Sequence, residues 1–171
     1  ETELLVAIAL ELLHDHQAVN VADLGTGSGA IALALAHERS CARIKATDIS
    51  SDALAIAQHN ATALGITNVQ FNRGAWFEPL AGQCFDMVTA NPPYVAIEDA
   101  DLDTIQTRHE PPLALFAGTD GLSALRIIIA EAPTHIRPDG YLIIEHGHLQ
   151  GQAVRNLLCH SGFHSIVTRN D

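Results

Sequence analysis

The spacing of hydrophobic positions along the chain switches repeatedly between that of a helix and that of a strand. Apolar residues three and four apart predict helices at residues 4–12, 31–35, 51–64, 122–132 and 150–159. Short apolar or alternating runs predict strands at residues 19–24, 42–47, 69–71, 85–90, 141–145 and 163–168. Thr2 and Ser51 are the expected N-caps of the first and third helices, and Gly65 is the expected end of the third. A turn is expected at residues 138–140, Pro-Asp-Gly.

Strands and helices alternate along the whole chain, which predicts a doubly wound α/β fold: a mostly parallel sheet with helices on both faces. In such sheets, ligands bind outside the carboxyl ends of the strands. The candidate functional residues all lie at or just after the ends of predicted strands: Gly25 to Gly29, Asp48, Trp76 and Asn91. We therefore expect them to meet at one edge of the sheet.

Composition narrows the class of protein. The 171 residues suffice for one domain, and a hydrophobic content of 47% indicates a globular chain. Three scattered cysteines without a CxxC pair predict reduced thiols and a cytoplasmic location, and no apolar run suggests a membrane partner. The net charge is −11 with only 9 Lys and Arg. Proteins that grip nucleic acid need a basic face, so we expect no direct nucleic-acid partner.

The loop after the first predicted strand, Gly25-Thr26-Gly27-Ser28-Gly29, is a candidate cofactor loop. Glycines let the backbone turn tightly and let a ligand approach closely. Asp48 ends the second predicted strand, where an acidic residue accepts hydrogen bonds from ribose hydroxyls. The glycine spacing also satisfies a dinucleotide pattern, so a nicotinamide enzyme is an alternative. The negative charge of Asp23 favours a cationic ligand over a pyrophosphate.

Asn91-Pro92-Pro93-Tyr94 follows the fourth predicted strand. Proline fixes φ and has no N–H, so the carbonyl groups of this segment stay free to accept hydrogen bonds. The Asn91 side-chain oxygen and the Pro92 carbonyl are suited to accept both hydrogens of a substrate NH2 group. Tyr94 offers a ring face for a planar amide or base. The motif therefore predicts chemistry at a planar nitrogen, with Asn91, Pro92 and Tyr94 as the catalytic residues.

With these motifs the sequence resembles the class I S-adenosylmethionine-dependent methyltransferases, and among them the release-factor glutamine N5-methyltransferases. The resemblance covers essentially the whole chain. It rests on these segments: Glu1-Thr2-Glu3, Asp23 to Ala36, Asn91 to Tyr94, Arg108 to Leu115, Gly118, Asp120-Gly121-Leu122, Glu145-His146-Gly147, Gln150-Gly151 and Val154. It implies methyl transfer to the glutamine amide of the Gly-Gly-Gln (GGQ) motif of peptide chain release factors.

The resemblance also implies roles for single residues. Gly25, Thr26, Gly27, Ser28 and Gly29 would bind S-adenosyl-L-methionine, whose product is S-adenosyl-L-homocysteine. Asp48 would hold the ribose, Trp76 would pack near the adenine and Asn91 would touch both cofactor and substrate. Substrate glutamine would lie against Asn91, Pro92, Pro93 and Tyr94.

Departures from the family accompany this resemblance. Family members have an acidic residue where this chain has Ala75, so we expect weaker cofactor binding or a compensating group. Residues 1–171 would form the catalytic domain, without the family's amino-terminal helical domain or its last antiparallel strand. The sequence begins at Glu1 rather than at methionine and stops at Asp171 after a strand-like run, so we expect a piece of a longer protein.

Other functions stay open at this point. The Asn-Pro-Pro-Tyr motif is shared with enzymes that methylate amino groups of adenine or guanine in nucleic acid. A cofactor-binding module with impaired catalysis is a further alternative, given Ala75 and the missing strand. His14 with His16 and His146 with His148 lack the further ligands of a metal site, so no metal is expected.

Overall fold

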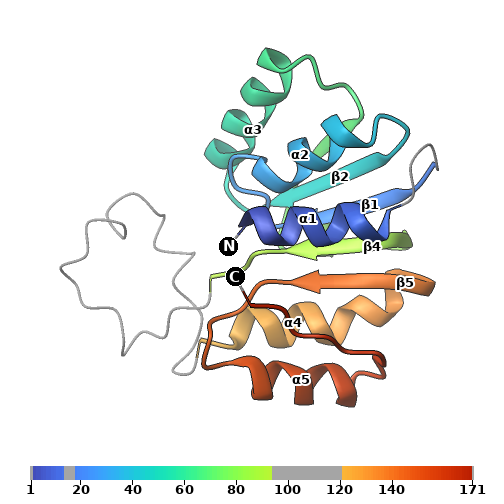
Figure 1. Ribbon diagram of the computed structural model, residues 1–171. Helices are drawn as coiled ribbons and strands as arrows, with labels where there is room; N and C mark the ends of the chain where they lie inside the picture. The colour runs from blue at the N-terminus through green and yellow to red at the C-terminus, as the bar shows by residue number, and fades with distance from the viewer. Residues whose placement is uncertain (1, 14–17, 94–120, 171) are drawn as a thin grey trace. The chain divides into compact units, whose positions relative to one another are not determined.

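The computed structural model describes residues 2–13, 18–93 and 121–170 and contains a parallel five-stranded sheet (Figure 1). The strand order is β3-β2-β1-β4-β5, and every neighbouring pair is parallel. The strands are β1 Asn20–Leu24, β2 Arg43–Asp48, β3 Val69–Arg73, β4 Phe85–Ala90 and β5 Ile136–Ile144. The predicted α/β fold with a parallel sheet is therefore confirmed.

The described residues fall into two compact units. The first unit comprises the described residues up to Asn91 together with Glu131–Glu145, so it contains the whole sheet. It also holds helices α1 Thr2–Leu12, α2 Ala30–Glu38 and α3 Ser51–Ala63, and the 3-10 turns η1 Glu78–Leu80 and η4 Ala132–Thr134. The second unit holds α4 Ser123–Glu131, apart from its last residue, and α5 Gly151–His160. Both helices of the second unit bury side chains at helical spacing, for example Val154 and Leu158 in α5.

The core of the first unit forms where α1 and α2 pack with β1 and β2. Alternate strand residues such as Val21, Ile44 and Ala46 point to the same face of the sheet, so they meet the apolar stripes of the two helices. Burying each large aliphatic side chain contributes roughly 1.5–3 kcal/mol. The buried residues at its centre are Leu5, Ala9, Leu13, Val19, Val21, Ile31, Ala32, Leu35, Ala36, Ala42, Ile44, Ala46 and Met87.

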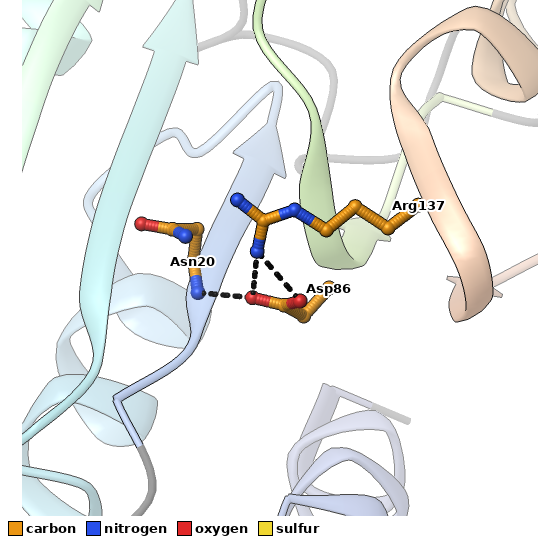
Figure 2. Close-up of polar contacts among 3 residues, drawn as sticks. All are labelled: Asn20, Asp86 and Arg137. Atoms are coloured by element: carbon orange, nitrogen blue, oxygen red, sulfur yellow. Dashed lines mark hydrogen bonds and ion pairs between the residues drawn. The ribbon is translucent and has the colours of Figure 1, made fainter.

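A polar cluster joins three strands at their amino ends (Figure 2). The Arg137 guanidinium donates to both oxygens of Asp86 at 2.7 Å, and the Asn20 N–H donates to Asp86 Oδ2 at 2.7 Å. Burial alone would raise the pKa of Asp86, but the Asn20 N–H and the Arg137 guanidinium outweigh it and lower that pKa. The cluster lies at the opposite end of the strands from the candidate site, so its role is to tie β1, β4 and β5 together.

Strand β5 begins at Ile136, before the predicted turn at residues 138–140. The predicted start of this strand at residue 141 was therefore wrong. Ile136 already pairs with Phe85, and the pairing resumes at Tyr141 with Met87. The Pro-Asp-Gly segment between them is accommodated as an irregularity within the strand, with Asp139 at φ 63°. A Cβ on Gly140 would lie 2.7 Å from Ile136 Cγ2 and 2.9 Å from the Asp86 carbonyl oxygen. Only glycine fits at this position. The Pro-Asp-Gly segment, which predicted a turn, therefore forms a bulge within the strand.

No strand forms at residues 163–168 in the described part of the chain, which corrects a second prediction. An alternating pattern makes a strand only when a neighbouring strand supplies hydrogen bonds. Here Arg155 in α5 holds the segment instead: its Nη1 donates to the Ile166 carbonyl and its Nη2 to Thr168 Oγ1.

Two predicted helix starts also differ from the structure. Ser50, not Ser51, caps α3: its backbone is extended and its Oγ accepts from the Ala53 N–H at 3.2 Å. Thr2 lies inside α1 rather than before it. The predicted stop at Gly65 agrees with the structure, since Gly65 has φ 67° just after the C-cap of α3.

Candidate active site

The site lies where the strand order reverses, between β1 and β4. Leu24, the last residue of β1, pairs with Ala90, the last residue of β4. Gly25 and Asn91 follow these paired residues directly, so the glycine loop and Asn91 leave the sheet side by side. This is the topological switch point at which parallel α/β sheets bind ligands.

Three positive-φ glycines shape the loop: Gly25 at 67°, Gly27 at 56° and Gly29 at 86°. A residue with a Cβ is strained in this region of φ, whereas glycine is not. A Cβ on Gly29 would meet Ala57 and Leu33 at 3.1 Å, so this glycine allows α2 and α3 to approach. A Cβ on Gly27 would meet nothing within 4 Å. Gly27 therefore presents backbone to open space.

Asp48 fastens the loop to the end of β2. Its Oδ2 accepts from the Gly27 N–H and its Oδ1 from the Ser50 N–H, both at 2.8 Å. The backbone adds a further link, since the Thr26 N–H donates to the Thr47 carbonyl at 2.9 Å. A carboxylate has about four acceptor positions, so two remain after these bonds. Asp48 is thus placed beside the loop with acceptor capacity left for hydroxyl groups.

Asp23 does not face a ligand, contrary to the argument from its charge. Its side chain is fully buried, and its two oxygens accept hydrogen bonds from Thr26 Oγ1 at 2.6 Å and Thr89 Oγ1 at 2.8 Å. Burial raises the pKa of Asp23 to about 6, although these hydroxyl groups lower it in part. The carboxylate therefore works inside the protein, where it connects the glycine loop to strand β4.

Trp76 lies against the start of the loop. Its backbone has φ 45°, and Thr47 Oγ1 donates to its carbonyl at 2.9 Å. A Cβ on Gly25 would lie 3.1 Å from the indole Cζ3, so the ring packs directly on the Gly25 backbone. The structure thus brings Trp76 to the loop, as the sequence predicted.

The position before Trp76 carries no acidic side chain, but an acidic group reaches it. Glu78 Oε2 accepts a hydrogen bond from the Ala75 N–H at 3.2 Å. A carboxylate therefore lies at the backbone of residue 75, supplied from three residues further along the chain.

Asn91 is half-buried at the end of β4, and its Nδ2 donates to Thr2 Oγ1 at 3.2 Å. Within the residues that the structure describes, no hydrogen bond reaches its Oδ1. Pro92 and Pro93 follow it in the chain and belong to the second unit. The predicted catalytic and substrate-binding Tyr94 lies outside the described residues.

Sequence reasoning missed three residues of this site. Thr89 precedes Asn91 by two positions, so strand alternation places both on one face, and a threonine in an apolar strand was the available signal. Thr2 was interpreted as a helix cap and as part of the segment that resembles the family, and was assigned no role in the site. Ile49 follows Asp48 directly, and its large apolar side chain is 52% exposed beside the end of β2.

The fold and this arrangement define the class of protein, an α/β domain with a parallel sheet whose glycine loop and Asn91 both follow strands at the switch point. Residues 15–164 match the family described as methyltransferase domain, and the chain belongs to that family. No helix in the described ranges is both long and apolar enough to cross a bilayer.

Curated relatives are named release factor glutamine methyltransferase. One from Xylella fastidiosa (strain Temecula1 / ATCC 700964) is 52% identical over the whole chain, and one from Escherichia coli (strain K12) is 42% identical. The chain spans 62% and 61% of their lengths, respectively. The resemblance expected from the sequence is thereby confirmed.

Solved structures show the same fold. Ribosomal protein L11 methylase from Lactobacillus delbrueckii subsp. bulgaricus matches with a TM-score of 0.72 at 23% identity, over 99% of this chain and 73% of that one. Precorrin-6y C5,15-methyltransferase from Geobacter metallireducens GS-15 matches with a TM-score of 0.64 at 16% identity, over 94% and 69%.

Proposed function

We propose that this chain is the catalytic domain of an S-adenosyl-L-methionine-dependent protein-glutamine N-methyltransferase. It would methylate the side-chain amide of the GGQ glutamine in peptide chain release factors and leave S-adenosyl-L-homocysteine. One observation carries the proposal: Asn91 and the glycine loop leave the sheet from paired residues, Ala90 and Leu24. An acceptor for a substrate amide thus stands next to a loop that exposes its backbone.

The cofactor is proposed to lie over the open side of the loop. Gly25 to Gly29 would face its methionine part, with Gly27 leaving space that a side chain would fill. The remaining acceptor positions of Asp48 suit the two ribose hydroxyls. Trp76 and the exposed Ile49 offer apolar surface for the adenine, and the Glu78 carboxylate held at Ala75 offers an acceptor for an amino group.

The chemistry requires positioning rather than a strong base. An amide nitrogen is a poor nucleophile because its lone pair is delocalised into the carbonyl. Acceptors on both of its hydrogens, Asn91 Oδ1 and the Pro92 carbonyl, favour a pyramidal nitrogen whose lone pair points at the methyl group. S-adenosyl-L-methionine would supply an electrophilic methyl group: the nitrogen would form the new C–N bond, the sulfur would keep the electron pair of the broken S–CH3 bond, and the nitrogen would lose a proton to water. Orientation of this kind is worth roughly 7–11 kcal/mol.

Glutamine rather than a nucleobase is proposed as the acceptor for two reasons. The relatives at 42–52% identity are named release factor glutamine methyltransferase, and the net charge of this chain is −11. An acidic surface repels a polyanion.

The three cysteines are free and exposed, which suits the reducing cytoplasm, where release factors act.

The test is transfer of a labelled methyl group by the complete protein that contains this chain. Parallel reactions receive a release factor, the same factor with its GGQ glutamine replaced by alanine, duplex DNA, and ribosomal RNA. The proposal expects label only in the intact factor. Label that persists without the glutamine, or appears in nucleic acid, overturns it.

A variant separates the two roles of Asn91. Asn91→Ala should abolish transfer while binding of S-adenosyl-L-methionine, followed by calorimetry, is largely kept. Equal loss of both would mean that Asn91 serves mainly the cofactor.

A further inference from the structure

The contact between Thr2 and Asn91 joins the first helix to the proposed acceptor residue. The residues are 89 positions apart in the sequence, yet Asn91 Nδ2 donates to Thr2 Oγ1 at 3.2 Å. Both lie in the first unit. Leu5 and Ala9 lie in the buried core, so the helix that carries Thr2 is packed against the sheet.

An asparagine amide has two unlike ends, and only one of them can serve an NH2 substrate. If Oδ1 points at the substrate, it accepts a hydrogen; if Nδ2 does, two donors face each other and no bond forms. In the structure the Thr2 hydroxyl takes the Nδ2 end, which leaves Oδ1 for the substrate. A hydrogen bond donated by the Nδ2 group also polarises the amide and makes its oxygen a better acceptor.

We propose that Thr2 is a positioning residue for methyl transfer: its hydroxyl orients the Asn91 side chain so that Oδ1 meets the substrate nitrogen. This rests on the proposed function in one respect, the presence of an NH2 group on the acceptor. It does not depend on whether that group belongs to an amide or to a base.

The test compares three substitutions in the complete protein. Thr2→Val keeps the shape of the side chain and removes the hydroxyl, whereas Thr2→Ser keeps the hydroxyl. Thr62→Val is the matched control, because Thr62 Oγ1 donates to the Gln58 carbonyl within α3, away from the site. Thr2→Val should lower kcat roughly tenfold, the effect of one neutral hydrogen bond, with KM and cofactor affinity within about twofold. Thr2→Ser and Thr62→Val should stay within about threefold of the unsubstituted protein.

Two outcomes overturn the inference. If kcat of Thr2→Val equals that of Thr62→Val, the contact does not position Asn91. If cofactor affinity falls in step with kcat, Thr2 serves the cofactor instead. A readout without turnover guards against loss of folding: the Asn91 side-chain amide signal in a nitrogen-15 NMR spectrum should move in Thr2→Val and stay in Thr62→Val.

The two proposals fail separately. If the unsubstituted protein methylates a nucleobase and not the release factor, the release-factor assignment falls. The same three variants assayed on that base then decide the role of Thr2.

Discussion

Thr89 Oγ1 donates a 2.8 Å hydrogen bond to Asp23 Oδ1 in the interior of the sheet. Asp23 belongs to β1 and Thr89 to β4, and the other Asp23 oxygen accepts from Thr26 in the glycine loop. One buried carboxylate therefore connects the candidate cofactor loop with the strand that leads to Asn91. It fixes the spacing between the two halves of the candidate site.

Loss of the Thr89 hydroxyl should destabilise the protein strongly, although the substitution changes only one side-chain group. Thr89→Val removes a hydrogen bond to a buried, charged group, which costs about 1.5–3 kcal/mol in free energy of unfolding at pH 7. Urea denaturation measures this loss. Thr89→Ser keeps the hydroxyl and should recover most of the stability; equal losses in both variants would contradict the role of the hydroxyl.

Asp23 should make stability depend on pH in a defined direction. Its pKa of about 6 lies above the ordinary value of 3.8, so between these values the folded protein binds more protons than the unfolded chain. Stability therefore falls as pH rises from about 4 to about 6, by roughly 3 kcal/mol in total.

Asp23→Asn should remove this contribution, since an asparagine does not titrate and can bond to both hydroxyl groups. Urea denaturation at pH 4, 5, 6 and 7 checks it through the difference between variant and parent. A difference that stays constant across this range would show that Asp23 is not protonated in the folded state near pH 5.

Gly27, in the candidate cofactor loop, and Gly65, outside it, form a matched pair of positions for a test of cofactor binding. Gly27 has φ 56° and Gly65 has φ 67°, and a Cβ on either meets nothing within 4 Å. Alanine at either position should therefore lower stability by about 1–2 kcal/mol through backbone strain alone. Only Gly27→Ala should weaken binding of S-adenosyl-L-methionine, by tenfold or more, because only its methyl group would enter the proposed cofactor space. Calorimetric titration of both variants compares them, and equal affinities would move the cofactor elsewhere.

The cluster in Figure 2 should matter for stability and not for the site. Arg137→Ala removes a pair whose side chains are 44% and 31% exposed, so solvent screening limits the loss to about 1 kcal/mol or less. The lowered pKa of Asp86 means that the pair stabilises the protein fully above the ordinary aspartate pKa, and that this stabilisation is lost as the pH falls below that value and through the lowered pKa. Thermal unfolding at low and high salt measures the effect. A change in cofactor affinity would show that the two ends of the sheet communicate.

The edge of the sheet could be predicted from the sequence because parallel strands bring their carboxyl ends together. Gly25, Asp48, Trp76 and Asn91 needed only the alternation of elements to be placed near one another. The roles of Asp23 and Thr2 could not be predicted in this way. Each depends on a partner more than 60 residues away, Thr89 or Asn91, whose side-chain direction follows only from the folded backbone.

The errors in the strands have a different cause. Local patterns register apolar alternation, but they do not show which neighbour supplies the hydrogen bonds. Residues 163–168 alternate between apolar and polar, but Arg155 rather than a neighbouring strand bonds to them. Pro138-Asp139-Gly140 breaks the strand pattern, yet the pairing of β4 with β5 continues on both sides of it.

The order of the elements along the chain has a consequence for synthesis. Thr2, the glycine loop, Asp48, Trp76 and Asn91 all precede the second unit in sequence, and β1 to β4 are hydrogen-bonded neighbours. A ribosome has therefore delivered these residues before it reaches any residue of the second unit. Strand β5 is synthesised later, so it joins the sheet beside β4 after the strands that lead to the candidate site have been made.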